Sequence, residues 1–561
     1  MSHMLSDKLR RAALVAAAAC CAAALAACGG GAAAVALVGG GVGTGGTGIA
    51  FGTVVGLGSV IVDGQTFSSA TPTYYAPTST SESAQTTSEA VELGARMDLS
   101  LGADNQPATA TVQPELQGVA QNVDAVHGTL TVNGMRVLVN TDPTRGPQTL
   151  YSGLTGLASI GPGSTNVEVH GAYGVDANGP YLWATLIEQV PGSSAVTRLV
   201  GTVSALSASS LTLDSSATPI PLGAGTSVVL PPGASLAPGE LVYAWNSGST
   251  WVLRVAGTGS FSGPVQVSGV AYGLGSNGFT VAGIPVDTTA MGAKAPALMA
   301  GQYVVVSGKS DGKGTLVAQK VDTYSAAAPS QFELHGTITG FVDASSFLVR
   351  GTPVDASQSP SFSGGSVSQL GNGVYVDITG QTSPTSGNVI VARTVTVHAS
   401  PAPGDTVDVQ GTITSVDAGP TQFTMNWQLQ GSTTPVTVTI AANCAYNHGE
   451  ASSVGVGKTV QVEGTWTGSG SVDAYTINFG ADGGSGDLEA SGRMYSWSQG
   501  SAVTGSSSTA TAQTTFMLGS YLLTIPVGTT IPAGFGDGAN VEVSFTPSGG
   551  VNTVQKLSVD N

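Results

Sequence analysis

The sequence predicts an all-β protein, a tandem array of about seven small β-barrel units after a signal peptide and a glycine-rich tether. Composition is the first reason, because 80 of the 561 residues are glycine and only 9% are charged, while Val and Thr are frequent. Val and Thr favour strands, and glycine favours the turns between them. The second reason is an alternation of polar and apolar residues, and the third is a pattern that recurs along the chain.

The amino terminus has the pattern of a lipoprotein signal peptide. Lys8, Arg10 and Arg11 precede the apolar run AALVAAAACCAAALAAC, which ends at Cys28. A positive segment before a short apolar segment is typical of a secretory signal. The last four residues, LAAC, resemble the lipobox of bacterial lipoproteins, in which the cysteine becomes the acylated first residue of the mature chain. We therefore expect residues 1–27 to be removed, Cys28 to be lipidated and residues 28–51 to form a glycine-rich tether. The alternatives are a membrane-spanning helix and a cleaved signal that leaves no anchor.

Lipid on Cys28 would place the protein in the cell envelope. Each buried methylene contributes about 0.8 kcal/mol, so two or three acyl chains hold a protein stably in a membrane. Gly29 stands where an aspartate would resemble an inner-membrane retention signal. The expected location is therefore the outer membrane or surface of a Gram-negative cell, and the membrane is an expected partner through the lipid.

Two elements recur in alternation after the tether. One is a glycine that opens a strand, as in GTITGFVDASSFLVRGTPVDA at 336–356, and the other is a strand pair, as in LMAGQYVVVSGKSDGKGTLVAQKVD at 298–322. Together they form one unit of variable loop length. The predicted units, numbered 1 to 7, are 52–116, 117–191, 200–258, 268–325, 333–399, 408–480 and 489–561. Unit 1 is interrupted by a Ser/Thr/Pro-rich stretch, 68–91, which we expect to be a solvated loop.

Within a unit, the residue pattern predicts a barrel wall. Val167 and Val169 alternate with Glu168 and His170, which is typical of a sheet with one face in the core and one in water. About five short strands per unit favour a closed or nearly closed barrel, because closure leaves no free edge. Tight hairpins are predicted at Asn-Gly and Asp-Gly pairs, which suit turns with positive φ; these are Asp63-Gly64, Asn133-Gly134, Asn178-Gly179 and Asp311-Gly312.

The lipobox, the tether, the entry GLGSVIVDG at 56–64 and the repeated units together resemble bacterial lipoproteins that carry the domain of unknown function 5666. The resemblance runs from Cys28 to the C-terminus and is best in the units that begin at Gly269 and Gly336. It implies an OB-like barrel in each unit and a cell-envelope location, with no established activity. Units 3, 6 and 7 depart from the pattern in their loop lengths.

Three short motifs match known sites in letters but not in context. GVGTGGTG at 41–48 satisfies the dinucleotide-binding GxGxxG, yet a signal peptide precedes it and a strand follows it. VGVGKTV at 454–460 lacks the first glycine of a phosphate-binding loop, because Ser452 stands there. GKSDG at 308–312 matches a nucleophile elbow but falls in a predicted hairpin. We therefore predict no cofactor.

Candidate chemistry in the repeated units is sparse. The histidines there fall singly, which predicts no metal pair; they are His127, His170, His335, His398 and His448. The stretch NCAYNHGE brings Cys444, His448 and Glu450 together as a candidate thiol or metal site, although a buried cysteine beside a polar loop is the commoner outcome. Six tryptophans could stack on ligands or fill cores, and we favour the cores; they are Trp183, Trp245, Trp251, Trp427, Trp466 and Trp497. No catalytic, cofactor-binding or metal-ligating residue is predicted.

Charge narrows the range of partners. The net charge is -17 with only 17 basic residues, which disfavours nucleic acid, because nucleic-acid binding depends on Lys and Arg at the phosphates. The predicted function is not enzymatic: a lipid-anchored envelope protein that acts as a surface spacer, adhesin or structural scaffold. The alternative is a binding module that holds oligosaccharide or peptide on the barrel faces. Candidate partners are glycans, envelope proteins and other copies of the chain.

Overall fold

The computed structural model of the chain describes residues 48–559 with several gaps. The gaps are 68–71, 78–83, 87–90, 103–105, 191–195, 224, 232, 248–249, 259–262, 384–387, 399, 420, 430–431, 448–449, 480–487, 496, 500–502, 504–505, 519–520, 537–538 and 549–550. The predicted signal peptide, Cys28 and His448 therefore lie outside the described residues.

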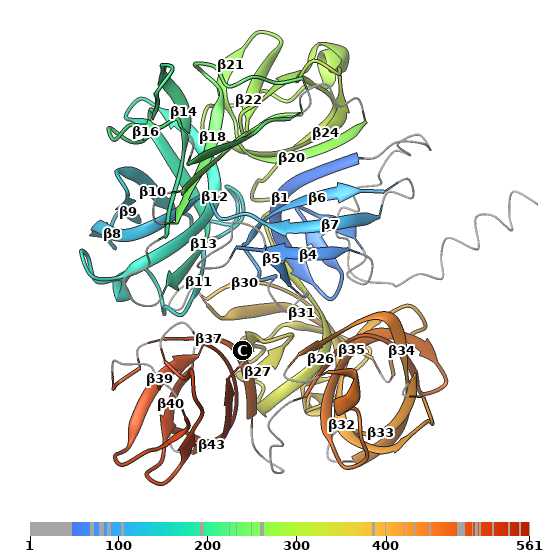
Figure 1. Cartoon of the computed structure of the whole chain (residues 1–561). Helices are drawn as coiled ribbons and strands as arrows, with labels where there is room; N and C mark the ends of the chain where they lie inside the picture. The colour runs from blue at the N-terminus through green and yellow to red at the C-terminus, as the bar shows by residue number, and fades with distance from the viewer. Residues whose placement is uncertain are drawn as a thin grey trace, which may run out of the picture. The chain divides into compact units, whose positions relative to one another are not determined.

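Units 6 and 7 are closed five-stranded barrels (Figure 1). In both, the strands follow the order 1-2-3-5-4, the third runs parallel to the fifth and the other neighbours are antiparallel. This is the Greek-key arrangement of an OB-like barrel. The strands of unit 6 are β32 (Thr406–Val416), β33 (Gln422–Leu429), β34 (Ser432–Asn447), β35 (Thr459–Gly468) and β36 (Ser471–Asn478). Those of unit 7 are β37 (Leu488–Tyr495), β39 (Thr514–Leu518), β40 (Tyr521–Ile525), β42 (Asn540–Ser548) and β43 (Val551–Val559), with a small pair, β38 (Ser508–Thr509) and β41 (Thr530–Ile531).

Units 2, 4 and 5 repeat this strand order, with the third strand again parallel to the fifth. Unit 2 contains β8 (Leu116–Asp124), β9 (Thr129–Val132), β10 (Met135–Val139), β11 (Leu150–Ser152), β12 (Asn166–Asp176) and β13 (Gly179–Val190). Unit 4 contains β20 (Pro264–Val270), β21 (Tyr272–Gly275), β22 (Gly278–Val281), β23 (Ile284–Asp287), β24 (Tyr303–Ser310) and β25 (Leu316–Thr323). Unit 5 contains β26 (Phe332–Asp343), β27 (Ser346–Val349), β28 (Thr352–Asp355), β29 (Ser361–Ser363), β30 (Tyr375–Thr382) and β31 (Ile390–His398).

Units 1 and 3 differ because their third strand is split into two short pieces. The first piece pairs with the second strand, and the other piece runs parallel to the fifth. Unit 1 contains β1 (Gly48–Leu57), β2 (Val60–Val62), β3 (Gln65–Phe67), β4 (Thr73–Ala76), β5 (Ala84–Thr86), β6 (Arg96–Leu101) and β7 (Pro107–Val112). Unit 3 contains β14 (Val196–Leu206), β15 (Ser210–Leu213), β16 (Ile220–Pro221), β17 (Thr226–Val229), β18 (Leu241–Ser247) and β19 (Thr250–Val255).

Helical structure in the described residues is limited to short 3-10 turns. These are η2 (Leu157–Ser159), η3 (Thr289–Lys294), η4 (Val367–Gln369) and η5 (Ala451–Ser453). Across the described residues, no helix has the length and apolar character needed to cross a membrane.

Two boundaries in unit 1 differ from the prediction. Strand β1 begins at Gly48, inside the segment predicted as tether, because residues 48–53 pair with β6. The stretch predicted as a solvated loop contains β4 and β5, which pair with each other, and β4 also pairs with β7. Tyr74 on β4 is buried among apolar neighbours. The apolar area that orders this stretch therefore comes from a tyrosine. The overall composition, rich in Ser, Thr and Pro, did not indicate this burial.

The array is tandem in sequence, but its first unit contacts units that are distant along the chain. Ile49, Ala50 and Phe51 of β1 pair in parallel with β20 of unit 4. Gly56 and Leu57 of the same strand pair with β26 of unit 5. Units 1 and 5 also share one apolar core. The units are therefore not separate beads on a string, because hydrogen bonds and core packing join them out of sequence order.

Candidate functional site: polar contacts between units

In units 1, 2 and 5, the turn between the second and third strands carries a side chain that contacts another unit. Its first residue has positive φ in four units and is followed by glycine: Asp63 (φ 47°), Asn133 (φ 52°), Ala282 (φ 48°) and Arg350 (φ 51°). Asp63 accepts a hydrogen bond from Ser268 of unit 4. Asn133 Nδ2 donates to the Arg198 carbonyl of unit 3 at 3.1 Å. Arg350 pairs with Glu463 of unit 6. The hairpins predicted at Asp63-Gly64 and Asn133-Gly134 are thus confirmed, and they also connect units.

In units 1, 2 and 5, the recurring glycine lies in the first strand and makes room for this side chain. A Cβ atom on Gly52 would lie 2.1 Å from Asp63 Oδ2, and one on Gly118 would lie 2.4 Å from Asn133 Oδ1. A Cβ on Gly336 would lie 3.2 Å from Arg350 Cγ. Real Cβ atoms do not approach polar atoms as closely as the first two distances. In units 1 and 2, the recurring glycine is therefore required by the turn residue that lies against it.

Arg96 is the centre of the largest buried polar contact, which we call the Arg96 cluster. It comprises Thr53, Asp63 and Arg96 of unit 1, Glu115 before β8, and Ser268 and Tyr303 of unit 4. Arg96 Nη1 donates to Thr53 Oγ1 and Ser268 Oγ, both at 3.1 Å, and Nη2 donates to the Ser268 carbonyl at 3.0 Å. All six residues are buried. The cluster therefore binds β1 and β6 to β20 and β24 with water excluded.

The charges of the Arg96 cluster are unbalanced, since one guanidinium faces two carboxyl groups. Burial raises the pKa of Glu115 to about 8, although Arg96, 3.6 Å away, and the Gly171 N–H partly offset it. Burial also raises the pKa of Asp63, against the attraction of Arg96. A buried group keeps its proton when ionisation is not compensated. Near neutral pH Glu115 is therefore expected to be largely protonated.

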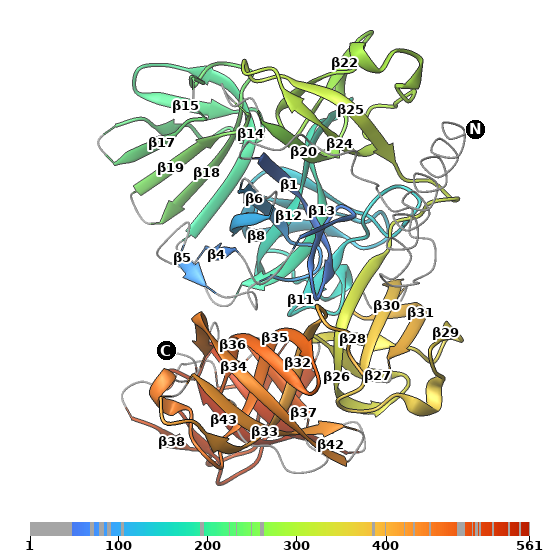
Figure 2. The same cartoon turned by 90° about the vertical axis from the view of Figure 1, so that its right-hand side faces the viewer.

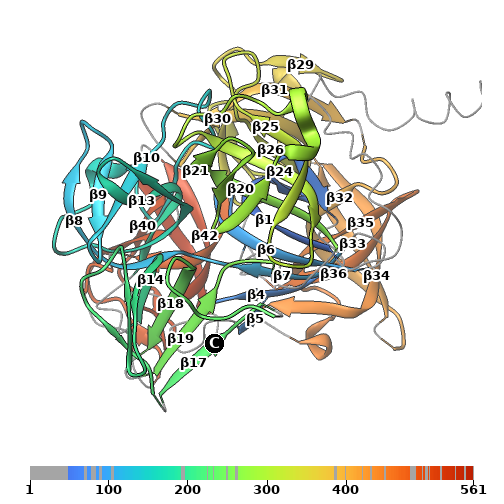
Figure 3. The same ribbon diagram turned by 90° about the horizontal axis from the view of Figure 1, so that it is seen from above.

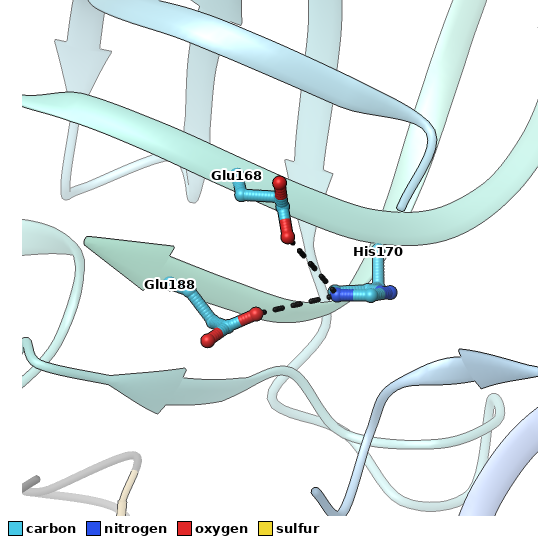
Figure 4. Close-up of side chains that lie close together, drawn as sticks. All are labelled: Glu168, His170 and Glu188. Carbon is cyan, nitrogen blue, oxygen red and sulfur yellow. Dashed lines mark hydrogen bonds and ion pairs between the residues drawn. The ribbon is translucent and has the colours of Figure 1, made fainter. Parts of the chain in front are cut away.

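Glu168, His170 and Glu188 lie beside this cluster and form the one group of possible metal ligands found among the described residues (Figure 4). His170 Nε2 lies 3.3 Å from Glu188 Oε2 and 4.0 Å from Glu168 Oε1. Arg198 Nε lies 3.7 Å from the other oxygen of Glu168. The three residues come from β12 and β13, where Glu168 and Glu188 stand opposite each other.

The hydrogen bonds of His170 do not fit a metal ligand. Its Nδ1 accepts the backbone N–H of Arg96 at 3.1 Å, so the lone pair on Nδ1 is already used. Burial lowers the pKa of His170 to about 4, so the ring is neutral and its single proton must sit on Nε2. That N–H points to Glu188, whereas a metal ligand would need a free lone pair there and a proton on the other nitrogen. The group is better described as a neutral histidine between two glutamates.

These contacts correct the prediction of a barrel face in water. Val167 and Val169 point into the core as expected, but the alternating Glu168 and His170 are also buried. Arg96, Glu115 and Tyr303 were not recognised from the sequence at all. A signal was present, because Arg96 stands between Ala95 and Met97 in a chain with only 17 basic residues. A charge inside an apolar strand of such a chain marks a buried partner.

A family model now accounts for part of the chain. The model of the family described as "Domain of unknown function (DUF5666)" matches residues 266–322, 335–396 and 410–478. Three segments of the chain match this model, and we refer to them below as the DUF5666 domains. They coincide with the barrels of units 4, 5 and 6, so the departure in loop length that we noted for unit 6 does not remove it from the family. Units 2 and 7, outside the matched residues, have the same strand order as the DUF5666 domains. No curated protein matches the chain.

The second DUF5666 domain brings two histidines together, so the prediction that the histidines fall singly is wrong. His335 Nδ1 lies 2.8 Å from one oxygen of Asp377, and His398 Nε2 lies 2.7 Å from the other. Burial alone would lower the pKa of His335, but hydrogen bonds to Asp377 and Glu333 raise it to about 9. The hydrogen bond to Asp377 likewise raises the pKa of His398. This half-exposed carboxylate therefore bridges two imidazole rings across β26, β30 and β31.

Two of the three residues singled out from sequence as a thiol or metal site, Cys444 and Glu450, have structural roles. Cys444, on the third strand of the third DUF5666 domain, is half-buried, and burial raises the pKa of its thiol to about 12. Glu450 accepts a hydrogen bond from Ser452 at 2.6 Å beside η5. His448 lies outside the described residues. A thiol with so high a pKa is a poor nucleophile at neutral pH.

The tryptophans and the two motif matches in the DUF5666 domains also have structural roles. Five tryptophans are buried and Trp251 is half-buried; the buried ones are Trp183, Trp245, Trp427, Trp466 and Trp497. The GKSDG segment ends β24 and enters the hairpin to β25, where Asp311 accepts the N–H of Lys313 at 2.7 Å. The VGVGKTV segment leads into strand β35 instead of a helix. Neither segment has the context that its motif requires.

Proposed function

We propose that the chain is a structural scaffold of the cell envelope whose barrels are joined into one body by buried polar contacts. The Arg96 cluster carries this proposal, because it places ionised and hydrogen-bonding groups of separate units in a common buried site. A buried charge without its partner costs several kcal/mol. Separation of units 1 and 4 would therefore be unfavourable, which suits a load-bearing or spacing role.

A non-enzymatic role is supported by the ionisable side chains that are buried in contacts between structural elements. Asp63, Glu115 and His170 are all buried and engaged in contacts between elements. The alternative role as a glycan-binding module depended on tryptophan platforms. Five of the six tryptophans are buried, so their rings are not available for stacking on a sugar. A scaffold is therefore the better supported proposal.

We also propose that lipid on Cys28 anchors the scaffold to the outer membrane. The support is the sequence LAAC after an apolar run and a basic segment. Acyl chains on one cysteine would hold the barrels at the membrane through the glycine-rich segment.

Fractionation of cells tests the anchor. Wild type should be found with the outer membrane and should partition into detergent, while Cys28→Ala should be released into the periplasm or medium. Cys444→Ala is the matched control, because it removes the cysteine of the barrel region and should leave the distribution unchanged. Protease added to intact cells then reports whether the barrels face outward. Equal membrane association of wild type and Cys28→Ala would refute the anchor, and release of all three would refute membrane association.

A further inference from the structure

Strand β17 of unit 3 is an exposed apolar edge. It pairs with β19 and, among the described residues, with no other strand (Figure 2). Val228 is 40% exposed, Val229 is 48% exposed and Leu230, which follows the strand, is 41% exposed. An edge that presents apolar side chains and unpaired backbone groups is a template for another strand.

The outward backbone groups of β17 can be assigned from one hydrogen bond. The Gly225 carbonyl accepts the N–H of Trp251 on β19 at 2.9 Å, so it points inward. Successive residues of a strand direct their backbone groups to opposite sides. Residues 227 and 229 therefore face β19, and Val228 directs its N–H and carbonyl away from the barrel. Val228 is the centre of the open edge.

In unit 1, the edge that corresponds to β17 is covered by another strand. Strand β4 occupies the place of β17, because each runs parallel to the last strand of its unit. The outer edge of β4 is covered by β5, which pairs with it antiparallel (Figure 3). The corresponding β11 of unit 2 is largely buried, and β29 of unit 5 presents Ser361 and Ser363 around one phenylalanine. Of these edges, β17 is the apolar one without a cover among the described residues.

The chemistry around β17 favours a second copy of the same segment as its partner. No charged residue occurs between Asp214 and Glu240, in a chain whose net charge is -17. Two copies repel each other where their acidic residues face, and they meet without repulsion along an uncharged strip. A strand paired antiparallel with its own copy also satisfies a twofold axis, which is the commonest symmetry of homodimers. We infer that β17 pairs antiparallel with β17 of a second copy of this chain.

This interface is small, so the association should be weak. Strand β17 has four residues, and Pro231 two positions later has no N–H to extend the pairing. Stable interfaces bury about 1,200 Å² or more, and a pair of four-residue strands falls below that size. The dimer should therefore form reversibly and depend on concentration. The inference does not depend on the lipid anchor.

Sedimentation of the full chain in detergent tests the association. Wild type should shift from monomer to dimer as the concentration rises into the micromolar to millimolar range. Val228→Lys keeps the backbone but places like charges across the twofold axis, and Val228→Pro removes the outward N–H while leaving the bonds to β19. Both variants should lower the association at least tenfold. Val126→Lys is the matched control, because Val126 is 89% exposed and lies in a different unit.

Cross-linking through introduced cysteines locates the contact. Cysteines introduced at 227, 228 and 229 should give disulfide-linked dimers that alternate in yield along the strand, above the background of wild type. Val126→Cys should give no more than that background. A wild-type chain that stays monomeric, or a dimer that Val228→Lys and Val228→Pro do not weaken, would overturn the inference. Equal cross-linking at 126 and at 227–229 would also overturn it, because it would indicate collision without pairing.

Discussion

Replacement of Arg96 by methionine should open the contact between units 1 and 4. Methionine keeps an apolar stem beside Phe51, over which the guanidinium carbon lies at 4.3 Å from the ring centre. It removes the four hydrogen bonds that Arg96 donates to Thr53, Ser268 and Tyr303. It also leaves the buried carboxyl group of Asp63 without the cation that favours its ionised form. Loss of one partner of a buried ion pair costs about 3–5 kcal/mol.

This cost corresponds to a large change in local opening. At about 1.4 kcal/mol per factor of ten, the equilibrium for exposing β20 and β24 should rise by roughly two to nearly four orders of magnitude. Hydrogen exchange measured by mass spectrometry reports this opening equilibrium directly, because the backbone amides of β20 and β24 exchange when the contact opens. Units 6 and 7, which have their own cores, should keep their protection.

Arg136→Met provides the matched control. Arg136 lies 2.6 Å from Asp176, but the two side chains are 27% and 36% exposed. Pairs of this kind contribute about 0–1 kcal/mol, so exchange should change less than tenfold. Hydrogen exchange in Arg96→Lys should be intermediate between that of Arg96→Met and Arg136→Met. Lysine keeps the positive charge but lacks the planar guanidinium that donates several hydrogen bonds at once. Equal exchange in Arg96→Met and Arg136→Met would refute the assignment of Arg96 as the centre of the contact.

Three further measurements test particular residues. Gly118→Ala should destabilise unit 2 by about 1–3 kcal/mol, since its Cβ meets Asn133, whereas Gly223→Ala, with open space around it, should have no effect on thermal unfolding. Glu115 has a pKa of about 8 in the folded protein, above its ordinary value, so its contribution to stability is present at low pH and is lost between about pH 4.5 and 8. Denaturation midpoints should therefore fall with pH over this range in wild type, and Glu115→Gln should remove this pH dependence. An unchanged pH dependence in the variant would contradict the raised pKa. His335, with a pKa of about 9, contributes stability that is present below about pH 6.5 and lost as the pH rises through 9. Asp377→Asn should lower the pKa of His335 in an NMR titration, and an unchanged pKa would contradict the role of Asp377.

Much of the fold could be predicted from the sequence because it is set by local patterns. Asp63-Gly64 and Asn133-Gly134 adopt the positive φ angles expected of tight hairpins, with 47° and 83° in the first pair. The alternation at Val167 and Val169 correctly predicted the inner face of a barrel. The repeated glycine lies inside the first strand of its unit, and the reason for it in units 1 and 2, a turn side chain that lies against it, could not be seen from the sequence.

The contacts between units could not be predicted, because an alternating pattern does not distinguish water from a polar partner. Glu168 and His170 are as polar as any solvated residue, yet they face Arg198 and Glu188 in a buried layer. Asp63 and Ser268 are 205 residues apart. A local sequence pattern cannot connect residues so far apart along the chain. For the same reason, the contacts of His335 and His398 with Asp377 could not be predicted.

The position of β1 has a consequence for the order in which the protein can fold. Its parallel partner in unit 4 begins at Val265, so roughly 200 residues must be synthesised after β1 before that partner exists. At about 5–20 residues per second this delay is on the order of 10–40 s. During that time an apolar strand with the sequence IAFGTVVGL lacks its partners in units 4 and 5. The nascent chain therefore carries an unsatisfied edge near its N-terminus for much of its synthesis, and a holding chaperone that recognises extended apolar strands would have its natural target there.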